Sequence, residues 1–258
     1  MMDTLTVVKV GGAVVEDEAR LATLLDGFCR LPGKKVLVHG GGRSATKIAA
    51  SLGIESKMVD GRRITDAETL RVVTMVYGGL VNKNVVAKLQ SRSINAVGLT
   101  GADMNVILSR RRPVKDGVDY GFVGDVERVD SDALADLVER GFTPVMAPLT
   151  HDGKGNILNT NADTIASETA KALARHYDVT LVYAFEKSGV LANPDDEGSV
   201  IRRIGRENYA KFKSEGVIAG GMIPKLDNAF AAIAAGVKRV AITKDTDLAA
   251  EEGTVASE

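Results

Sequence analysis

Short runs of apolar, often β-branched residues alternate along this chain with longer stretches in which apolar residues recur at helical spacing. Such continuous apolar runs are typical of strands buried on both faces of a parallel sheet. In the first part of the chain the pattern predicts strands over 4–10, 35–38, 96–99 and 143–146, and helices over 17–29, 44–52, 131–140 and 160–175. It also predicts a long helix over 69–90, interrupted by Gly78-Gly79, and a hairpin from 106–109 and 121–129.

A second, shorter series begins near Val179, with strands predicted over 181–185 and 239–243 and helices over 206–214 and 222–235. Strands that alternate with helices indicate an α/β fold, a three-layer αβα sandwich around a mostly parallel open sheet. We place a lobe boundary between residues 177 and 178, which gives an N-terminal lobe of residues 1–177 and a C-terminal lobe of residues 178–258. A cleft between the lobes is the expected ligand site.

Composition narrows the class of protein. The 258 residues are 45% hydrophobic and 26% charged, and 33 Lys plus Arg against 34 Asp plus Glu give a net charge of -1. This balance argues against a general nucleic-acid or membrane-surface binder, and the run Arg110-Arg111-Arg112 is expected to be a solvated turn. One Cys and three His give neither an internal disulfide nor a metal-ligating set. Without a signal peptide or an apolar run of about 20 residues, we expect a cytoplasmic protein.

Two glycine turns each follow a predicted strand: Lys9-Val10-Gly11-Gly12 and His39-Gly40-Gly41-Gly42. In an open parallel sheet, ligands bind beyond the carboxyl ends of the strands. Consecutive glycines let backbone N–H groups approach an anion, and the helix after the second turn adds its positive N-terminal end. The turns therefore predict one shared anion site, although each alone would also suit a plain tight turn.

Several familiar sites are absent from the sequence. There is no G-x-x-x-x-G-K-[ST], no G-x-G-x-x-G and no G-x-S-x-G, which excludes a P-loop, a dinucleotide fingerprint and a lipase nucleophile elbow. We expect His39 to be a structural residue at the end of a strand rather than a catalyst.

Charged and amide side chains stand beside these turns. Lys9 lies near the end of a strand, and the residues around it are apolar and expected to be buried. Lys225 lies in the first turns of a helix, where a cation is unfavourable unless an anion binds there. Asn159, Asn161 and Asp163 lie at the start of the helix predicted over 160–175, ahead of its regular turns from Thr164 to Ala174. One of them is explained as a helix cap, while Asp163 is expected to be ionised and to hold lysine ammonium groups.

Arg63 follows Gly61-Arg62 and precedes Thr65, whose side chain is predicted to cap a helix with Glu68 completing a capping box. A guanidinium beside such a turn offers a fork for a substrate carboxylate, the alternative being a solvated arginine.

The motifs occur together in a fixed order: Lys9-Val10-Gly11-Gly12, Val38-His39-Gly40-Gly41-Gly42, Gly61-Arg62-Arg63-Ile64-Thr65, Asn159-Thr160-Asn161-Ala162-Asp163 and Gly221-Met222-Ile223-Pro224-Lys225. In this combination the sequence resembles the acetylglutamate kinases of the amino-acid kinase family, over nearly the whole chain. The resemblance implies the carbamate kinase-like fold of that family and the phosphorylation by ATP of the side-chain carboxylate of N-acetyl-L-glutamate, in arginine biosynthesis. It also implies a homodimer formed through the N-terminal lobe, which binds the acyl amino acid, and a C-terminal lobe that binds ATP, with Mg²⁺ held through the ATP phosphates.

By the same resemblance, residues take roles by position. The catalytic residues would be Lys9, Lys225 and Asp163. The substrate-binding residues would be Gly41, Gly42, Arg63, Asn159 and Asn161. The nucleotide-binding residues would be Gly11, Gly12, Glu186, Lys187, Ser188, Gly189, Val190, Leu191, Val217, Ile218 and Ala219.

Some positions depart from the family pattern. Many members carry an aspartate in the nucleotide loop, where this chain has Phe185-Glu186-Lys187-Ser188-Gly189. Residues 103–124 match the substrate lid only loosely, so a larger acyl group such as succinyl stays an alternative to acetyl, with Arg62 or Arg110-Arg111-Arg112 as partners for its extra carboxylate. The chain also starts at its first strand, which suggests a dimer insensitive to arginine.

Other classes of function also remain to be weighed. A sister kinase acting on glutamate, aspartate, carbamate or a nucleotide is one alternative, and a non-catalytic amino-acid sensor is another. A nicotinamide-dependent oxidoreductase lacks its glycine fingerprint.

Overall fold

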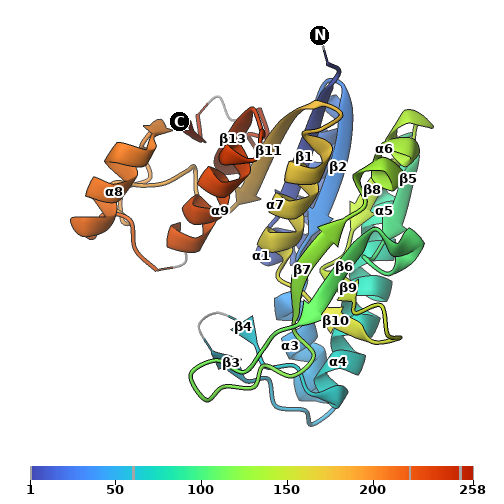
Figure 1. Cartoon of the computed structure of the whole chain (residues 1–258). Helices are drawn as coiled ribbons and strands as arrows, with labels where there is room; N and C mark the ends of the chain where they lie inside the picture. Colours follow the sequence, from blue (N-terminus) through green and yellow to red (C-terminus); the bar gives the residue numbers. More distant parts are fainter. Residues whose placement is uncertain (1, 60–61, 221, 250–251, 258) are drawn as a thin grey trace.

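A mixed sheet of eight strands forms the centre of the molecule (Figure 1). The computed structural model describes every residue except 1, 60–61, 221, 250–251 and 258. The strands are β1 (Thr4–Val10), β2 (Lys34–His39), β5 (Ala96–Leu99), β8 (Thr143–Met146), β11 (Asp178–Phe185), β12 (Arg203–Ile204), β13 (Arg239–Lys244) and β14 (Thr254–Ala256). Their order is β12-β14-β13-β11-β1-β2-β8-β5, and every neighbouring pair is parallel except β13 with β14. The predicted mostly parallel sheet is confirmed.

Helices cover both faces of this sheet. They are α1 (Gly12–Glu16), α2 (Glu18–Arg30), α3 (Gly42–Ser51), α4 (Ala67–Val73), α5 (Asn82–Gln90), α6 (Ser131–Glu139), α7 (Ala162–Leu173), α8 (Arg206–Ser214) and α9 (Met222–Ala234). Alternation along β1 explains the layers, because Leu5 and Val7 pack with residues of α6, α7 and α9 while Val8 and Val10 pack with α1, α2 and α5. Lys9 shares the face of Leu5 and Val7, which directs its side chain toward α7 and α9.

Acidic or amide side chains cap the N-termini of α2, α6 and α7. Asp17, Asp130 and Asn161 each accept hydrogen bonds from backbone N–H groups of the first turn that they precede. The predicted cap at Thr65 is wrong, since Asp66 caps α4 and accepts from the Thr69 N–H at 2.8 Å. The physical reason is that the Thr65 hydroxyl has other partners within the fold.

The predicted interruption at Gly78-Gly79 is a change of helix type and not a break. Residues Thr74–Val81 form a π-helix, η1, which continues directly from α4 into α5. Stretches of π-helix are uncommon and concentrate at functional sites. This one carries Tyr77, a buried residue, toward the glycine turn after β2.

Smaller sheets build the lower part of the molecule in Figure 1. The predicted hairpin is confirmed as β6 (Ile107–Arg111) with β7 (Gly124–Val129), preceded by a short 3₁₀ turn, η2 (Asp103–Asn105). The structure adds strands that the sequence pattern did not predict: β3 (Met58–Val59), β4 (Arg62–Arg63), β9 (Leu149–His151) and β10 (Ile157–Asn159). Some of their side chains line a cavity together with the glycine turn after β2, namely Met58, Arg62, Arg63 and Asn159.

The proposed lobe boundary coincides with the start of β11, which lies between β1 and β13 in the same sheet. Both predicted lobes therefore contribute strands to one continuous sheet, and their separate binding roles stay predictions. Within the described part of the chain, no helix combines the length and the apolar character that crossing a membrane requires.

Candidate active site

The two glycine turns lie against each other at the carboxyl edge of the sheet. Gly11 and Gly12 follow β1, and the Gly40 N–H donates to the Val10 carbonyl at 3.2 Å. A Cβ atom on Gly40 would stand 3.2 Å from the Gly12 nitrogen, and one on Gly12 would stand 3.8 Å from the Gly41 nitrogen. The two backbones thus approach closely because neither carries a side chain here. The predicted neighbourhood of the turns is confirmed, while anion binding by them stays a proposal.

His39 holds the turn Gly40-Gly41-Gly42 in place through hydrogen bonds of both of its ring nitrogens. Its Nδ1 lies 2.7 Å from the Gly40 carbonyl oxygen, and its Nε2 lies 3.1 Å from Nδ2 of Asn82, which also donates to the Val145 carbonyl at 2.9 Å. Asn82 is therefore the donor toward Nε2, and the proton of the ring is on Nδ1. Burial lowers the pKa of His39 to about 4, so the ring is neutral at neutral pH. His39 acts as a structural tether, as expected from its position.

Asp163 joins two lysines that come from distant parts of the sequence. It is the second residue of α7, and its Oδ1 lies 2.8 Å from Lys9 Nζ while its Oδ2 lies 2.7 Å from Lys225 Nζ. Burial alone would raise the pKa of Asp163, but the two ammonium groups outweigh it and lower the pKa to about 2. The prediction that Asp163 holds lysine ammonium groups is confirmed.

The cluster carries more positive than negative charge. Burial lowers the pKa of Lys9, and the neighbouring Lys225 acts in the same direction, whereas the Asp163 carboxylate opposes both. Two cations that share one carboxylate in a part-buried position leave a net positive charge at the end of the sheet. Such a site attracts an anion, and a phosphoryl group in transfer is the anion that a kinase must stabilise.

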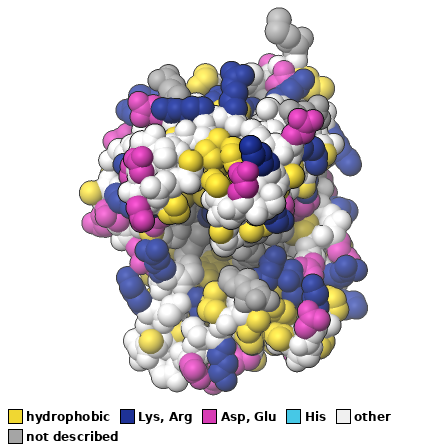
Figure 2. Space-filling model, turned by 90° about the vertical axis from the view of Figure 1, so that its left-hand side faces the viewer, with side chains coloured by type: hydrophobic (Ala, Val, Ile, Leu, Met, Phe, Trp, Pro, Cys, Tyr) yellow, Lys and Arg dark blue, Asp and Glu magenta, His cyan; other side chains and the backbone are white. Residues whose placement is uncertain are grey.

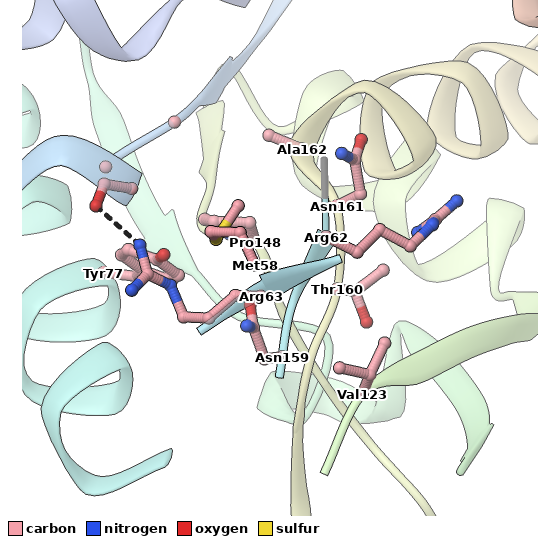
Figure 3. A pocket seen from close by; sticks show the side chains of 13 residues that line it. Met58, Arg62, Arg63, Tyr77, Val123, Pro148, Asn159, Thr160, Asn161 and Ala162 are labelled. Atoms are coloured by element: carbon pink, nitrogen blue, oxygen red, sulfur yellow. Dashed lines mark hydrogen bonds between the residues drawn. The ribbon is translucent and has the colours of Figure 1, made fainter. Parts of the chain in front are cut away.

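A cavity of about 190 Å³ opens beside the glycine turn (Figure 3). All the predicted substrate-binding residues line it: Gly41, Gly42, Arg63, Asn159 and Asn161. They come from α3, β4, β10 and the start of α7, so segments far apart in the sequence converge there. In Figure 2 the molecular surface is hollowed between an upper part at the height of α8 and α9 and a lower part at the height of β3 and β4.

Arg63 is a fixed residue of the cavity wall. Its guanidinium donates to Ser56 Oγ at 2.6 Å, to the Gly42 carbonyl at 2.9 Å and to Thr46 Oγ1 at 2.8 Å. Only 8% of the residue is exposed, so the alternative of a solvated arginine does not hold. A guanidinium held in this way presents its charge to the cavity at little cost in side-chain entropy.

Asn159 and Asn161, the two amide residues before α7, have different roles. Asn159 is buried and donates from Nδ2 to Thr65 Oγ1 at 2.9 Å, which explains why Thr65 does not cap α4. Asn161 caps α7, its Oδ1 accepting from the N–H groups of Asp163 and Thr164 at 2.8 and 3.2 Å. Among the described residues nothing accepts a hydrogen bond from the Asn161 amide nitrogen, which leaves that donor for a ligand.

The predicted nucleotide loops lie between Asp163 and Lys225 in the sequence. Glu186 follows β11, and its Oε1 lies 3.6 Å from Arg43 Nη2, while Lys187 Nζ lies 3.2 Å from Glu197 Oε1. The two residues that depart from the family pattern, Glu186 and Lys187, therefore form surface ion pairs. Val190 and Ile218 are buried in one core cluster, so their side chains hold the loops in place. Contact with a nucleotide would then come from the backbone and from neighbouring residues, and these roles stay predictions.

The remaining loop residues behave in different ways. A Cβ on Gly189 would stand 2.7 Å from Thr254 Oγ1, so this glycine is required by the close approach of β14. Leu191 is buried and Lys187 and Ala219 are exposed, whereas Ser188 and Val217 are half-buried. In the motifs quoted above, Gly61 and Gly221 lie outside the described residues.

The sequence singles out Arg62 only as an alternative partner for a larger acyl group, and it does not single out four other residues that line the cavity. These four are Met58, Tyr77, Val123 and Pro148. Tyr77 of η1 lines the cavity, although in the sequence it is one more bulky residue in an apolar helix. Arg62 also lines it, pointing to the side opposite its neighbour Arg63 (Figure 3), as adjacent residues of a strand do. Burial lowers the pKa of Arg62, and nearby Arg112 adds to that effect.

Comparisons with known proteins agree with this geometry. A model of the amino acid kinase family matches residues 4–244. The protein named acetylglutamate kinase from Bacteroides thetaiotaomicron is 67% identical over 254 residues, covering 98% of this chain and 98% of that protein. Among solved structures, N-acetylglutamate synthase from Neisseria gonorrhoeae, complexed with coenzyme A and N-acetylglutamate, has a TM-score of 0.83 at 23% identity, over 99% of this chain and 59% of that chain.

The fold also matches carbamate kinase from Giardia lamblia bound to AMP-PNP, with a TM-score of 0.68 at 15% identity, over 100% of this chain and 99% of that chain. This likeness confirms the expected carbamate kinase-like fold. The chain therefore belongs to the amino acid kinase family, on the branch whose curated members carry the name acetylglutamate kinase.

Proposed function

We propose that this chain transfers the γ-phosphoryl group of ATP to the side-chain carboxylate of N-acetyl-L-glutamate, a step of arginine biosynthesis. The observation that carries the proposal is the pair of ammonium groups on Asp163, from Lys9 and Lys225, at the sheet edge where the glycine turns meet. The name and the 67% identity of the Bacteroides thetaiotaomicron relative support the same reaction.

The residues present suit the chemistry of phosphoryl transfer to a carboxylate. The nucleophile is ionised at neutral pH, so the reaction requires no general base. What it requires is positioning and neutralisation of the charge on the transferring group. Lys9 and Lys225 would donate hydrogen bonds to the phosphoryl oxygens, and Asp163 would hold both ammonium groups at the correct separation.

Arg63 would bind the carboxylate that is not phosphorylated. Its guanidinium is anchored on Ser56, Thr46 and the Gly42 carbonyl, and its charge lies at the cavity wall. The backbone N–H groups of Gly41 and Gly42, at the N-terminus of α3, would add donors to the same substrate. Asn159 and Asn161 would contribute amide groups from the opposite wall.

ATP would bind beside β11 and α9, with the loops Glu186–Leu191 and 217–219 at its base and ribose. Within the described residues no group of three or more His, Cys, Asp or Glu side chains lies together to hold a metal ion. Mg²⁺ would accompany ATP and would be bound chiefly through its phosphates, where it would neutralise part of their charge.

The position of Arg62 supports a succinyl group as an alternative to the acetyl group of the substrate. Arg62 places a further guanidinium at the cavity wall, on the side away from Arg63, and its charge is partly desolvated. A carboxylate at the end of the acyl chain, as in N-succinyl-L-glutamate, would find a partner there. N-acetyl-L-glutamate stays the primary substrate of the proposal, with N-succinyl-L-glutamate as the alternative.

The homodimer and the cytoplasmic location expected from the sequence stay predictions. Light scattering on the purified protein after gel filtration tests the first, since a dimer has twice the mass of the chain.

The reaction itself is tested with the purified protein, Mg-ATP and hydroxylamine, which traps acyl phosphates as coloured hydroxamates. N-acetyl-L-glutamate, N-succinyl-L-glutamate and free L-glutamate are compared at equal concentration. Hydroxamate formed with an N-acyl substrate supports the proposal and identifies the acyl group. Product from free glutamate alone would move the chain to a sister kinase, and a folded, ATP-binding protein without product would favour a sensor.

A further inference from the structure

Tyr77 combines burial with a hydroxyl group at a ligand cavity. The residue is 5% exposed and belongs to the π-helix η1, and it lines the cavity beside Arg63 (Figure 3). The neighbouring Arg63 side chain can only donate to its hydroxyl, and among the described residues nothing accepts the hydroxyl proton. A buried hydroxyl usually finds a partner, so the proton that it can donate is left for whatever fills the cavity.

The ring of Tyr77 supports the glycine turn from one side. A Cβ atom on Gly41 would stand 2.8 Å from Tyr77 Cδ1 and 3.1 Å from Cε1, so the ring occupies the space that a side chain would need. This contact explains the glycine at position 41 by close approach. It also holds the first turn of α3, whose N–H groups face the substrate in the proposed function, in one position.

The hydroxyl and the Arg63 guanidinium converge over the next residue. The position of a Cβ on Gly42 lies 3.9 Å from Arg63 Nη2 and 3.9 Å from Tyr77 Oη. Burial raises the pKa of Tyr77, and the Arg63 charge only partly opposes this, so the hydroxyl is protonated at neutral pH. Both N–H groups of Nη2 already donate, to the Gly42 carbonyl and to Thr46 Oγ1, so a carboxylate at this point meets the charge of Arg63 and the hydroxyl donor of Tyr77.

The geometry points to Tyr77 as a substrate-binding residue that donates a hydrogen bond from its hydroxyl to the substrate carboxylate that faces Arg63, the one that is not phosphorylated. This inference rests on the proposed function, because that function supplies the carboxylate. This role would also account for the π-helix, because its wider turn brings Tyr77, in the middle of a long helix, to the glycine turn.

Tyr77→Phe removes the hydroxyl and keeps the ring against Gly41. A hydrogen bond to a charged group is worth roughly tenfold in binding. We expect the KM for the N-acylglutamate to rise about tenfold, with the kcat, the KM for ATP and the thermal unfolding midpoint close to wild type. Tyr77→Leu, which also removes the ring, should lower the kcat as well, because the glycine turn loses its support.

The matched control is Tyr177→Phe, whose hydroxyl donates to Glu139 away from the cavity and whose loss should leave all kinetic constants unchanged. An unchanged KM for the acyl substrate in Tyr77→Phe, with an active wild type, would overturn the role of Tyr77 alone. A wild type without turnover of any acylglutamate would overturn the proposed function and this inference together.

Discussion

Lys225 Nζ lies 2.7 Å from Asp163 Oδ2, and this ion pair joins α9 to α7 across the predicted lobe boundary. Because Lys9 occupies the other carboxylate oxygen, a single side chain of the N-terminal lobe fixes one cation from each lobe. A movement of α9 relative to α7 would change the distance between the two ammonium groups. The spacing of the charges that would bind the phosphoryl group is thus set by the packing of α7 against β1 and α9.

Replacing either lysine should reduce the chemical step more than the binding of ATP. Lys9→Ala and Lys225→Ala each remove a charge whose hydrogen bonds would strengthen in the transition state, so we expect the kcat to fall about 10²- to 10³-fold and the KM for ATP to rise less than about tenfold. Steady-state kinetics with varied ATP measures both constants.

Lys34→Ala is a suitable control for these variants, since Lys34 pairs with Asp3 and Glu139 instead of the site carboxylate. It should have wild-type kinetics. An unchanged kcat in Lys9→Ala or Lys225→Ala would remove that lysine from the mechanism.

The alkaline limb of kcat/KM should report the state of Lys9. Burial lowers the pKa of Lys9 from its usual 10.5, so the limb is expected below that value. In Asp163→Asn the limb should move to still lower pH, because the carboxylate that raises the pKa of Lys9 is gone. In Lys9→Arg it should move to higher pH, since a guanidinium stays protonated. The same limb in all three proteins would contradict the assignment.

Much of this site follows from local sequence, for physical reasons. A strand that ends in Lys9 and two glycines, next to a second strand that ends in glycines, fixes two backbone turns at one edge of a parallel sheet. The parity of Lys9 along β1 then fixes the face on which its charge lies. Asp163 follows the helix cap Asn161 and is held near the same edge. These inferences use only strand and helix periodicity.

Some features could not be predicted from the sequence because they depend on contacts between residues far apart in the chain. Thr65 and Asp66 are both capable caps, and the choice between them depends on the bond from Asn159 to Thr65, across 94 residues. The place of Tyr77 depends on a π-helix, in which a shift of hydrogen-bond partners leaves no periodic signal. The missed hairpin of β9 and β10 had a signal, since Asp152-Gly153 is a common turn pair between short apolar runs.

Arg63→Ala should weaken the binding of the acyl substrate. Loss of a guanidinium that pairs with a carboxylate is expected to raise the KM for N-acetyl-L-glutamate about 10- to 100-fold, with a smaller change in the KM for ATP. Arg63→Lys should restore little, because an ammonium has three N–H donors, and bonding Ser56, Thr46 and the Gly42 carbonyl would leave none for the substrate.

Arg140→Ala, at the exposed C-terminal end of α6, is the matched control for Arg63 and should leave both KM values unchanged. A defect confined to ATP in Arg63→Ala would refute the assigned role.

His39 should make the protein less stable as the pH falls below about 6.5. Its pKa is about 4 in the folded protein, against 6.5 for an unperturbed histidine, so the unfolded chain binds more protons between these values. The stabilisation that neutral His39 contributes is complete above the unfolded pKa and is lost as the pH falls toward the folded one. At 1.36 kcal/mol for each pKa unit, the loss amounts to about 3 kcal/mol.

Urea unfolding at pH 7 and pH 4.5 measures this loss. His39→Gln keeps a polar group near Asn82 and has no such titration, so its free energy of unfolding should be lower at pH 7 but should fall less between the two pH values. Carboxylate titration is common to both proteins and cancels in the comparison. Equal losses in wild type and His39→Gln would mean that His39 is charged in the folded state. In that case it could not accept the Asn82 hydrogen bond that fixes the glycine turn.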